Sequence, residues 1–394
     1  MRVCAWLAAA FLMLLVPDAL QGQAPQKGKE QTARSQSRDI AFRYLREWGD
    51  EQQAMGKAWQ ATKASEAQIR RESDAHREKW TKRFFELAEK YPEEPLLVTL
   101  LSNLAGQYSS EPEPPKEVYR VLEFLATHHL KDDKLTHICH HLEGWPTTVE
   151  IERFLKSLVN ENPSKTVQAL ARLVLAEGYR RHINNPRTTE AARGGYRRET
   201  ERLLSEIVEK YADVEDRGRV YRILNASKTE YSSKIGPFAE GRLYELQSLA
   251  PGKPAPEFEG SNVRGERVKL SDFRGKIVVL TFWFVGCEPC REMLPQERSL
   301  VAKLPAEHFA MVGVSLDDDK AELEQFLEKE KITWPIVWAK GWVGPIVQKY
   351  NIRSCPTIYV LDQRGMIRFK NVRGKALDDA VDELMREMQA NKGK

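Results

Sequence analysis

Cysteine is scarce in this chain, with five in 394 residues. Scaffolds framed by disulfides use many more for their size, so that class of protein is excluded. The chain also lacks a strong charge of one sign, because 61 Lys and Arg residues nearly balance 57 Asp and Glu residues. No long basic run interleaved with aromatic residues occurs, so nothing predicts binding to nucleic acid.

No apolar run reaches the roughly 20 residues that a membrane-spanning helix needs. The longest, Val3–Val16, follows Arg2 and precedes small and polar residues. This pattern predicts a secretory signal over residues 1–24, with cleavage after Gly22 or Ala24. An uncleaved anchor that leaves the protein membrane-associated is the alternative. In either case we expect an exported protein, periplasmic or secreted.

Residues 30–248 favour helices almost throughout. The stretch from Ser35 to Pro92 is charged, has recurrent apolar positions and contains no internal proline, which predicts one or two long amphipathic helices. Later segments such as "FLKSLVNENPSKT" and "LLSEIVEKYADVE" each end an apolar-periodic helix in a polar turn. Helix pairs at irregular intervals resemble tetratricopeptide-type repeats, and a plain helical bundle is the alternative.

A proline-rich segment, "LAPGKPAPEFEG", ends the helical region and predicts a boundary at 248/249. We expect the two parts to fold independently and a protease to cut first near Pro251–Phe258. Residues 249–394 then alternate strands and helices, which defines an α/β domain. The apolar run Ile277–Val285 predicts a buried central strand, and "ITWPIVWAKGWVG" predicts a loop.

Two cysteines in "FWFVGCEPCREMLP" have the spacing of a redox pair and also of half a zinc site. Zinc would need two further ligands, and no second such pair or paired histidines lie nearby. Cys287 follows the buried strand and should begin a helix, with Pro289 in its first turn, where proline is tolerated. Because a helix N-terminus stabilises a thiolate, we expect Cys287 to be the nucleophile. Cys290, one turn on and more buried, should resolve the mixed disulfide.

The motifs "FWFVGCEPCREMLP", "VGVSLDDD" and "RSCPTIYVLDQRG" resemble the thioredoxin superfamily, in particular its exported TlpA/ResA-like branch. The resemblance covers about a third of the chain, residues 251–389. It implies a thioredoxin-like fold with an extra helix and strand between its halves, and exchange of dithiols with disulfides at Cys287 and Cys290. It also implies that Pro356 is a cis-proline facing the pair and that Pro295 kinks the active-site helix.

The partners that this resemblance implies are protein disulfides or dithiols, among them components of cytochrome c assembly. No cofactor and no metal is predicted for the domain. The overall expectation is therefore an N-terminal all-helical region, bundle or solenoid-like, followed by a thioredoxin-like α/β domain. A protein-binding helical scaffold, whose partner is a peptide or protein and whose redox domain is accessory, is the alternative function.

Three residues depart from the family pattern. Gly286 stands where a tryptophan usually precedes the first cysteine, and Thr281 stands where thioredoxins proper have a buried acid that helps to shuttle protons. Cys355 precedes the cis-proline, where threonine or valine is usual. Its thiol could form an alternative disulfide with Cys287, complete a three-thiolate site for a soft metal, or simply pack.

Glu288 and Trp283 complete the residues expected around the site. A carboxylate beside Cys287 disfavours its thiolate, and a less stabilised thiolate makes the reduced form less favoured. Glu288 therefore points to a reductant rather than a disulfide donor. A peroxidase of the peroxiredoxin type would need Thr or Ser three residues before its cysteine, and Phe284 stands there.

A histidine-rich stretch, "THHLKDDKLTHICHH", is a candidate metal site in the helical region. His137 and His141 share a helix face at i, i+4, as metal-binding pairs do. No carboxylate-rich segment identifies a third ligand, so polar faces of a helical hairpin are the preferred interpretation.

Overall fold

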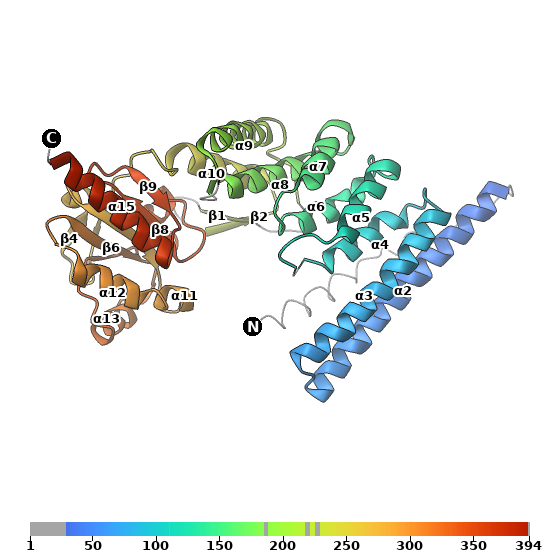
Figure 1. Ribbon diagram of the computed structural model, residues 1–394, viewed down its shortest axis with the longest axis horizontal. Coiled ribbons are helices and arrows are strands. Elements are labelled where there is room, and N and C mark those ends of the chain that lie inside the picture. The colour runs from blue at the N-terminus through green and yellow to red at the C-terminus, as the bar shows by residue number, and fades with distance from the viewer. Residues whose placement is uncertain (1–28, 110, 185–187, 217–220, 225–228, 393–394) are drawn as a thin grey trace. The chain divides into compact units, whose positions relative to one another are not determined.

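The computed structural model describes residues 29–392, except 110, 185–187, 217–220 and 225–228 (Figure 1). The segment predicted to be a secretory signal lies outside these described residues. The chain divides into two compact units, which meet in the sequence between Arg181 and His182. Within the described residues no helix has both the length and the apolar character needed to cross a membrane.

The first unit is helical. Its elements are α2 Lys29–Thr62, α3 Glu66–Lys90, α4 Leu96–Gly106, α5 Lys116–His128, the 3₁₀ turn η2 Asp133–Leu135, α6 Thr136–Leu142 and α7 Val149–Glu161. Helix α8, Lys165–Asn184, extends across the sequence position at which the units meet.

Helices α2 and α3 form a long antiparallel hairpin (Figure 1), in the stretch where the sequence predicted one or two long helices. The hydroxyl of Ser65 caps α3 by accepting from the Gln68 amide. The Trp80 indole donates to Glu51 over 2.9 Å, and the Trp48 and Phe84 rings lie 5.9 Å apart. In an antiparallel hairpin, later residues of α3 contact earlier residues of α2, as these two contacts do. Buried aromatic rings, together with ion pairs such as Arg83–Glu47, therefore hold the two helices together.

A tetratricopeptide-type array is not confirmed. The helices that follow the hairpin differ widely in length, from 7 residues in α6 to 13 in α5 and α7 and 20 in α8. Repeats of one type would stack units of one length. The weak echo in the sequence instead reflects separate amphipathic helices that each bury one apolar face.

The second unit contains α9 Glu190–Lys210, β1 Tyr221–Leu224, β2 Thr229–Ser232, α10 Gly236–Ser248, β3 Glu259–Ser261, β4 Arg267–Lys269, the 3₁₀ turn η3 Leu270–Phe273 and β5 Ile277–Trp283. After these come α11 Glu288–Arg291, α12 Leu294–Lys303, β6 Phe309–Ser315, α13 Lys320–Lys329, β7 Ile336–Trp338, α14 Pro345–Lys349, β8 Thr357–Leu361, β9 Ile367–Lys370 and α15 Lys375–Lys392.

Two expectations about these elements were wrong. Strands β1 and β2 pair as an antiparallel hairpin inside the region expected to be helical. Strand β7 lies inside the segment expected to be a loop and pairs in parallel with β6. These strands have three or four residues each. Segments so short show no recognisable period of two, and only pairing with a neighbour makes them strands.

A five-stranded sheet in the order β7-β6-β5-β8-β9 forms the centre of the α/β part. Strand β5 pairs in parallel with β6 and antiparallel with β8, and every one of its residues is buried. The predicted central strand is therefore confirmed. Helix α13 and strand β7 lie between the two halves of the fold, as the family resemblance implied.

Side chains of β5 alternate between two apolar layers. Ile277, Val279 and Trp283 contribute to one layer, which helices α12, α13 and α15 cover (Figure 1). Val278, Leu280 and Phe282 contribute to the other, against Phe258, α14 and Tyr350. Both cysteines of the redox motif belong to the first layer.

Helix α10 packs against the α/β part of its own unit. Glu245 is only 9% exposed and accepts from the Asn351 amide over 2.7 Å. Its carboxylate also pairs with Arg242 at 3.2 Å and Lys370 at 3.7 Å. The Tyr244 hydroxyl donates to the Lys349 carbonyl. The α/β part is therefore fastened to the last helix before the predicted boundary.

The proline-rich segment is itself held in place. Gly252 donates to Ile367, Ile367 donates to Lys253, and Ala255 donates to Gly365, all through backbone groups. The Tyr350 hydroxyl donates to the Pro256 carbonyl over 2.6 Å. These contacts do not fit the expectation that a protease cuts here first. The boundary at 248/249 stays a prediction, but this segment does not have the character of an open linker.

Glu245→Ala should destabilise the second unit, because it leaves the partly buried Arg242, Arg353 and Lys370 charges without this buried carboxylate. We expect a loss of about 3 kcal/mol in the free energy of unfolding, measured with urea. Glu240→Ala on the exposed side of the same helix is the matched control and should change it by less than about 0.5 kcal/mol.

Limited proteolysis of the same proteins should leave residues 251–258 intact in the wild type and expose them in Glu245→Ala. Equal losses of stability in the two variants, or early cleavage of the wild type in that segment, would show that α10 does not fasten the α/β part.

Candidate active site

The candidate site begins where strand β5 ends. Beyond Trp283 the Val285 amide donates to Asp317 Oδ1 over 2.9 Å, and the Ser315 hydroxyl donates to Oδ2 over 2.8 Å. Burial raises the pKa of Asp317, and these hydrogen bonds oppose the rise. Asp317 thus fixes the loop that leads from the strand to the cysteines.

Cys287 and Cys290 form a disulfide with a Cα–Cα distance of 5.3 Å. Cys287 is the N-cap of α11, and its sulfur accepts from the Cys290 amide over 3.2 Å. The pair therefore lies at the strand-to-helix junction that the sequence predicted. Cys290 is not the more buried of the two, since Cys287 is 4% and Cys290 5% exposed. The bond draws both residues into the same apolar layer, which sequence spacing could not reveal.

Proline shapes the helix that follows. Pro289 lies in the first turn of α11, and Pro295 lies in the first turn of α12. Since proline cannot donate to the preceding turn, a continuous helix is interrupted between Arg291 and Leu294. The interruption matches the kink that the family resemblance implied at Pro295.

The Cys355–Pro356 peptide bond is cis, as the resemblance implied. Thr357 pairs with Phe282 across the sheet, so Pro356 and Cys355 lie beyond the end of β5, where the cysteine loop also begins. Pro356, Trp283 and Cys290 line one cavity. Cys355 is half-buried and packs against both apolar layers.

The solvent-facing side of the site carries Glu288, which is exposed at the start of α11. Gly286 is exposed as well, and a Cβ there would meet the Phe284 ring at 3.2 Å. Trp342, from the loop after β7, packs edge-on against Phe284 with 5.7 Å between ring centroids. An aromatic residue is therefore brought beside the loop by the fold, although position 286 itself has none.

Glu297 is the residue at this site that the sequence reasoning missed. It lies on α12, is 7% exposed, and lines the same cavity as Cys290, Thr281 and Pro356. Burial raises its pKa to about 7, and Arg298 opposes the rise. Its position three residues after Leu294 and three before Leu300 puts it on the apolar face of α12. A charged residue on the apolar face of α12 was the signal in the sequence that could have identified Glu297.

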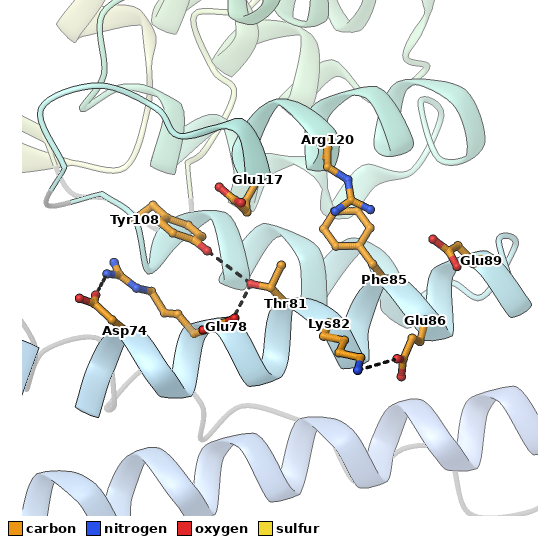
Figure 2. A pocket seen from close by; sticks show the side chains of 11 residues that line it. Asp74, Glu78, Thr81, Lys82, Phe85, Glu86, Glu89, Tyr108, Glu117 and Arg120 are labelled. Carbon is orange, nitrogen blue, oxygen red and sulfur yellow. Dashed lines mark hydrogen bonds and ion pairs between the residues drawn. The ribbon is translucent and has the colours of Figure 1, made fainter. Parts of the chain in front are cut away.

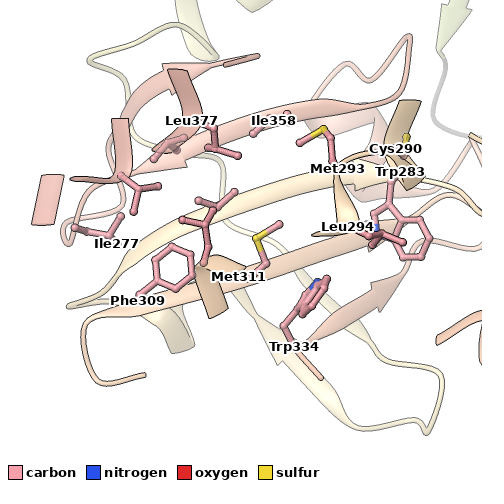
Figure 3. Close-up of a cluster of buried hydrophobic side chains, with 14 of the residues drawn as sticks. Ile277, Trp283, Cys290, Met293, Leu294, Phe309, Met311, Trp334, Ile358 and Leu377 are labelled. Carbon is pink, nitrogen blue, oxygen red and sulfur yellow. The ribbon is translucent and has the colours of Figure 1, made fainter. Parts of the chain in front are cut away.

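The surroundings of the cysteines are otherwise apolar. Figure 3 shows Trp283, Cys290, Met293 and Leu294 together at one end of the apolar layer, with Ile277 and Phe309 at the other. The Trp283 and Phe326 rings lie 5.7 Å apart and cover the inner side of the site. Apolar side chains therefore make up most of the inner side of the disulfide.

The histidine-rich stretch forms α6 and the turn before it. Burial, and after it the charges of the neighbouring His140 and His137, lowers the pKa of His141 to about 4. Among the residues that the structure describes, no group of three His, Cys, Asp or Glu side chains is arranged to hold a metal ion. The stretch contributes apolar residues such as Leu135 and Ile138 to the helical core.

A second cavity opens on the helical unit, between α3, the end of α4 and α5 (Figure 2). Four of its eight charged side chains pair with one another, Asp74 with Arg77 and Lys82 with Glu86. The Phe85 ring is covered by the Arg120 guanidinium at 4.0 Å. The cavity therefore offers no uncovered aromatic anchor among its lining residues.

Comparison with known proteins points to the same part of the chain. The sequence model of the AhpC/TSA family matches residues 251–370. Thioredoxin-like protein YneN of Bacillus subtilis is 34% identical over 134 residues, which are 32% of this chain and 76% of that protein. Thiol-disulfide oxidoreductase ResA of Geobacillus kaustophilus is 30% identical over 124 residues, 32% of this chain and 70% of that protein.

Solved structures with similar sequences have the same kinds of names. The thioredoxin domain of a thiol-disulfide oxidoreductase from Bacteroides vulgatus is 34% identical, with a TM-score of 0.33, and the match covers 34% of this chain and 98% of that one. A Chlorobium tepidum protein described as thiol:disulfide interchange protein DsbE is 29% identical, with a TM-score of 0.32, over 36% of this chain and 99% of that one.

Glu297→Gln should change how stability depends on pH. The pKa of Glu297 is about 7 in the folded protein and 4.5 when unperturbed, so its contribution to stability is complete below about pH 4.5 and is lost as pH rises to 7. Above pH 7 the wild type should therefore be less stable than Glu297→Gln by up to about 3 kcal/mol. Urea unfolding at pH 5 and pH 8 measures this, and equal differences at both pH values would contradict it.

Proposed function

This chain belongs, through its C-terminal third, to the thioredoxin-like thiol-disulfide oxidoreductases, and we propose that Cys287 and Cys290 are the pair through which it exchanges electrons with protein disulfides. The observation that carries the proposal is the Cys287–Cys290 disulfide at the junction of β5 and α11, with the cis-Pro356 segment beside it. The AhpC/TSA match does not favour a peroxidase, because Phe284 stands where that chemistry needs Thr or Ser.

The roles of the two cysteines follow from their positions. Cys287 is the N-cap of α11, where unpaired amide groups favour a thiolate, so it attacks the substrate disulfide. Cys290 then attacks the sulfur of Cys287 and releases the reduced substrate. Trp283 and Pro289 shape the surroundings of the pair, and Pro356 lies beside it at the cavity.

The direction proposed for this exchange is reduction of the substrate. Glu288 places a carboxylate next to Cys287 and opposes the effect of the helix N-terminus on the thiolate. A thiolate that is less stabilised makes the dithiol a stronger reductant. Exposure of Glu288 limits the size of this effect, because solvent and salt screen it.

The place of action that we propose is outside the cytoplasm. The support is the signal-like segment 1–24 in the sequence, with a short apolar run after Arg2. An oxidising compartment would keep the Cys287–Cys290 bond closed unless an upstream donor reduces it. Protein disulfides are the proposed substrates, with components of cytochrome c assembly as candidates because the resemblance of the motifs around Cys287 to the TlpA/ResA-like branch implies them.

The helical region is proposed to serve the redox domain as a surface for a protein or peptide partner. The alternative, in which this scaffold is the main function, gains no support from the cavity between α3 and α5, whose aromatic rings are covered by arginine side chains. Thiol-disulfide exchange is therefore the function that the geometry supports best.

Cys287→Ser should abolish reduction of insulin by the full chain, because the attacking thiolate is lost. Cys290→Ser should instead accumulate a mixed disulfide with the substrate, detectable by mass spectrometry, because nothing resolves it. If both variants reduced insulin at the wild-type rate, the assignment would fail and the scaffold function would take its place.

Glu288→Gln should lower the pKa of Cys287 in the reduced protein, since a negative charge beside the thiolate is removed. Titration of thiolate absorbance at low ionic strength measures it, with Glu292→Gln as a control of equal charge change at the other end of α11. An unchanged or higher pKa in Glu288→Gln would remove the argument for a reductant.

Cys355 is proposed to take part in the redox site through an alternative disulfide. Under oxidant, Cys290→Ser should show a Cys287–Cys355 bridge by mass spectrometry if the two Cα atoms approach within roughly 7 Å. Finding neither sulfur bridged, together with full activity of Cys355→Val, would reduce Cys355 to a packing residue.

A further inference from the structure

The cavity beside the redox pair is lined by a threonine where thioredoxins have an acid, and by a glutamate from another element. Thr281 lies on β5 where thioredoxins proper have a buried acid, and its side chain is 2% exposed. Glu297 lines the same cavity from α12, and Cys290 lines it from α11. The cavity therefore contains an acid from α12, although β5 contributes none to it.

No structural role accounts for a carboxylate at Glu297. Its carboxylate makes no hydrogen bond or ion pair with any residue that the structure describes, although it is 93% buried. The cavity around it is lined mainly by apolar side chains, such as Trp283, Leu294 and Phe326. Burying an unpaired carboxyl group costs stability, and residues of this kind concentrate at functional sites.

We propose that Glu297 accepts the proton of the Cys290 thiol when Cys290 resolves the mixed disulfide at Cys287. This inference rests on the proposed function, since it needs Cys290 to be the resolving thiol. The cavity has room for about one water molecule, so the proton passes to Glu297 directly or across a single water.

The exchange balances with Glu297 in this role. The Cys287 thiolate attacks the substrate disulfide, a Cys287–substrate bond forms, and the first substrate thiolate leaves. The Cys290 proton then passes to Glu297, the Cys290 sulfur bonds to Cys287, and the second substrate thiolate leaves. Two electrons have moved from the cysteines to the substrate. Glu297 returns its proton to the leaving thiolate, and solvent protonates the other.

The charge environment suits a group that must both take and give a proton near neutral pH. Burial brings the pKa of Glu297 to about 7, close to the range in which a thiol can be deprotonated. Arg298 is the cation that opposes this rise, and it is also engaged by Glu330 at 2.7 Å. Arg291 lines the outer part of the cavity and is exposed, while β5 and α13 contribute no ionisable side chain to the lining.

The two chemical steps can be separated with the reduced full chain and excess 5,5′-dithiobis(2-nitrobenzoate) in stopped flow. The first release of chromophore reports attack by Cys287, and the second reports resolution by Cys290. In Glu297→Gln the first release should stay within about twofold of wild type, and the second should slow about tenfold or more at pH 7. The rate of the second release should level off above about pH 7 in the wild type and keep rising with pH in the variant.

Two matched variants distinguish proton transfer by Glu297 from a general effect of lost charge and from an effect on folding. Glu292→Gln removes an exposed carboxylate five residues away and should leave both phases unchanged. Glu297→Asp keeps a carboxylate and should recover part of the second phase and its plateau. A second phase in Glu297→Gln with the wild-type rate and pH profile, or equal slowing in Glu292→Gln, would overturn the proposal.

Failure of the proposed function has a different signature. If wild type gave no release of chromophore, or if Cys287→Ser gave both releases at the wild-type rate, the redox pair itself would be wrongly assigned. The inference about Glu297 fails alone when the wild type shows both phases, Cys287→Ser shows neither, and the Glu297 variants match the wild type.

Discussion

The active-site geometry depends on the pairing of strand β5 with a neighbour on each side. Parallel pairing with β6 and antiparallel pairing with β8 satisfy its backbone groups without water, and all seven of its side chains are buried. Because both ladders end near Trp283, the chain must leave the sheet there. The first residues of β8 lie at the same end, so the cysteines and the cis-proline meet without any local signal that directs one to the other.

Three of the buried carboxylates in the second unit have different surroundings. Asp317 accepts hydrogen bonds from Val285 and Ser315 and so orders the loop before Cys287. Glu245 is surrounded by cations and fastens α10 to the α/β part. Glu297 has neither kind of partner among the described residues. The first two carboxylates have a structural role. The burial of Glu297 without a partner is accounted for only by the proton transfer proposed at Cys290.

Within the second unit, helix α10 and the α/β part are joined more closely than a proline-rich segment suggests. Proline favours extended backbone and ends helices, so three prolines around Gly252 resemble a linker in the sequence. In the fold, Gly252 and Lys253 hydrogen-bond to Ile367, the first residue of β9, and Ala255 bonds to Gly365 in the turn before it. An extended segment can serve as an edge strand as readily as a linker, and only the presence of an unpaired neighbour decides which.

The sequence by itself determined the elements that long patterns encode. The apolar run from Ile277, the helix start at Cys287 and the long hairpin before Pro92 follow from burial, capping and periodicity, which are local properties. It could not identify β7 or the β1–β2 hairpin, because strands that short exist only through their partners. Nor could it identify Glu297 as a neighbour of Cys290 or Glu245 as a buried anchor. Periodicity tells which face of an element is buried, but only tertiary packing decides which buried groups face each other.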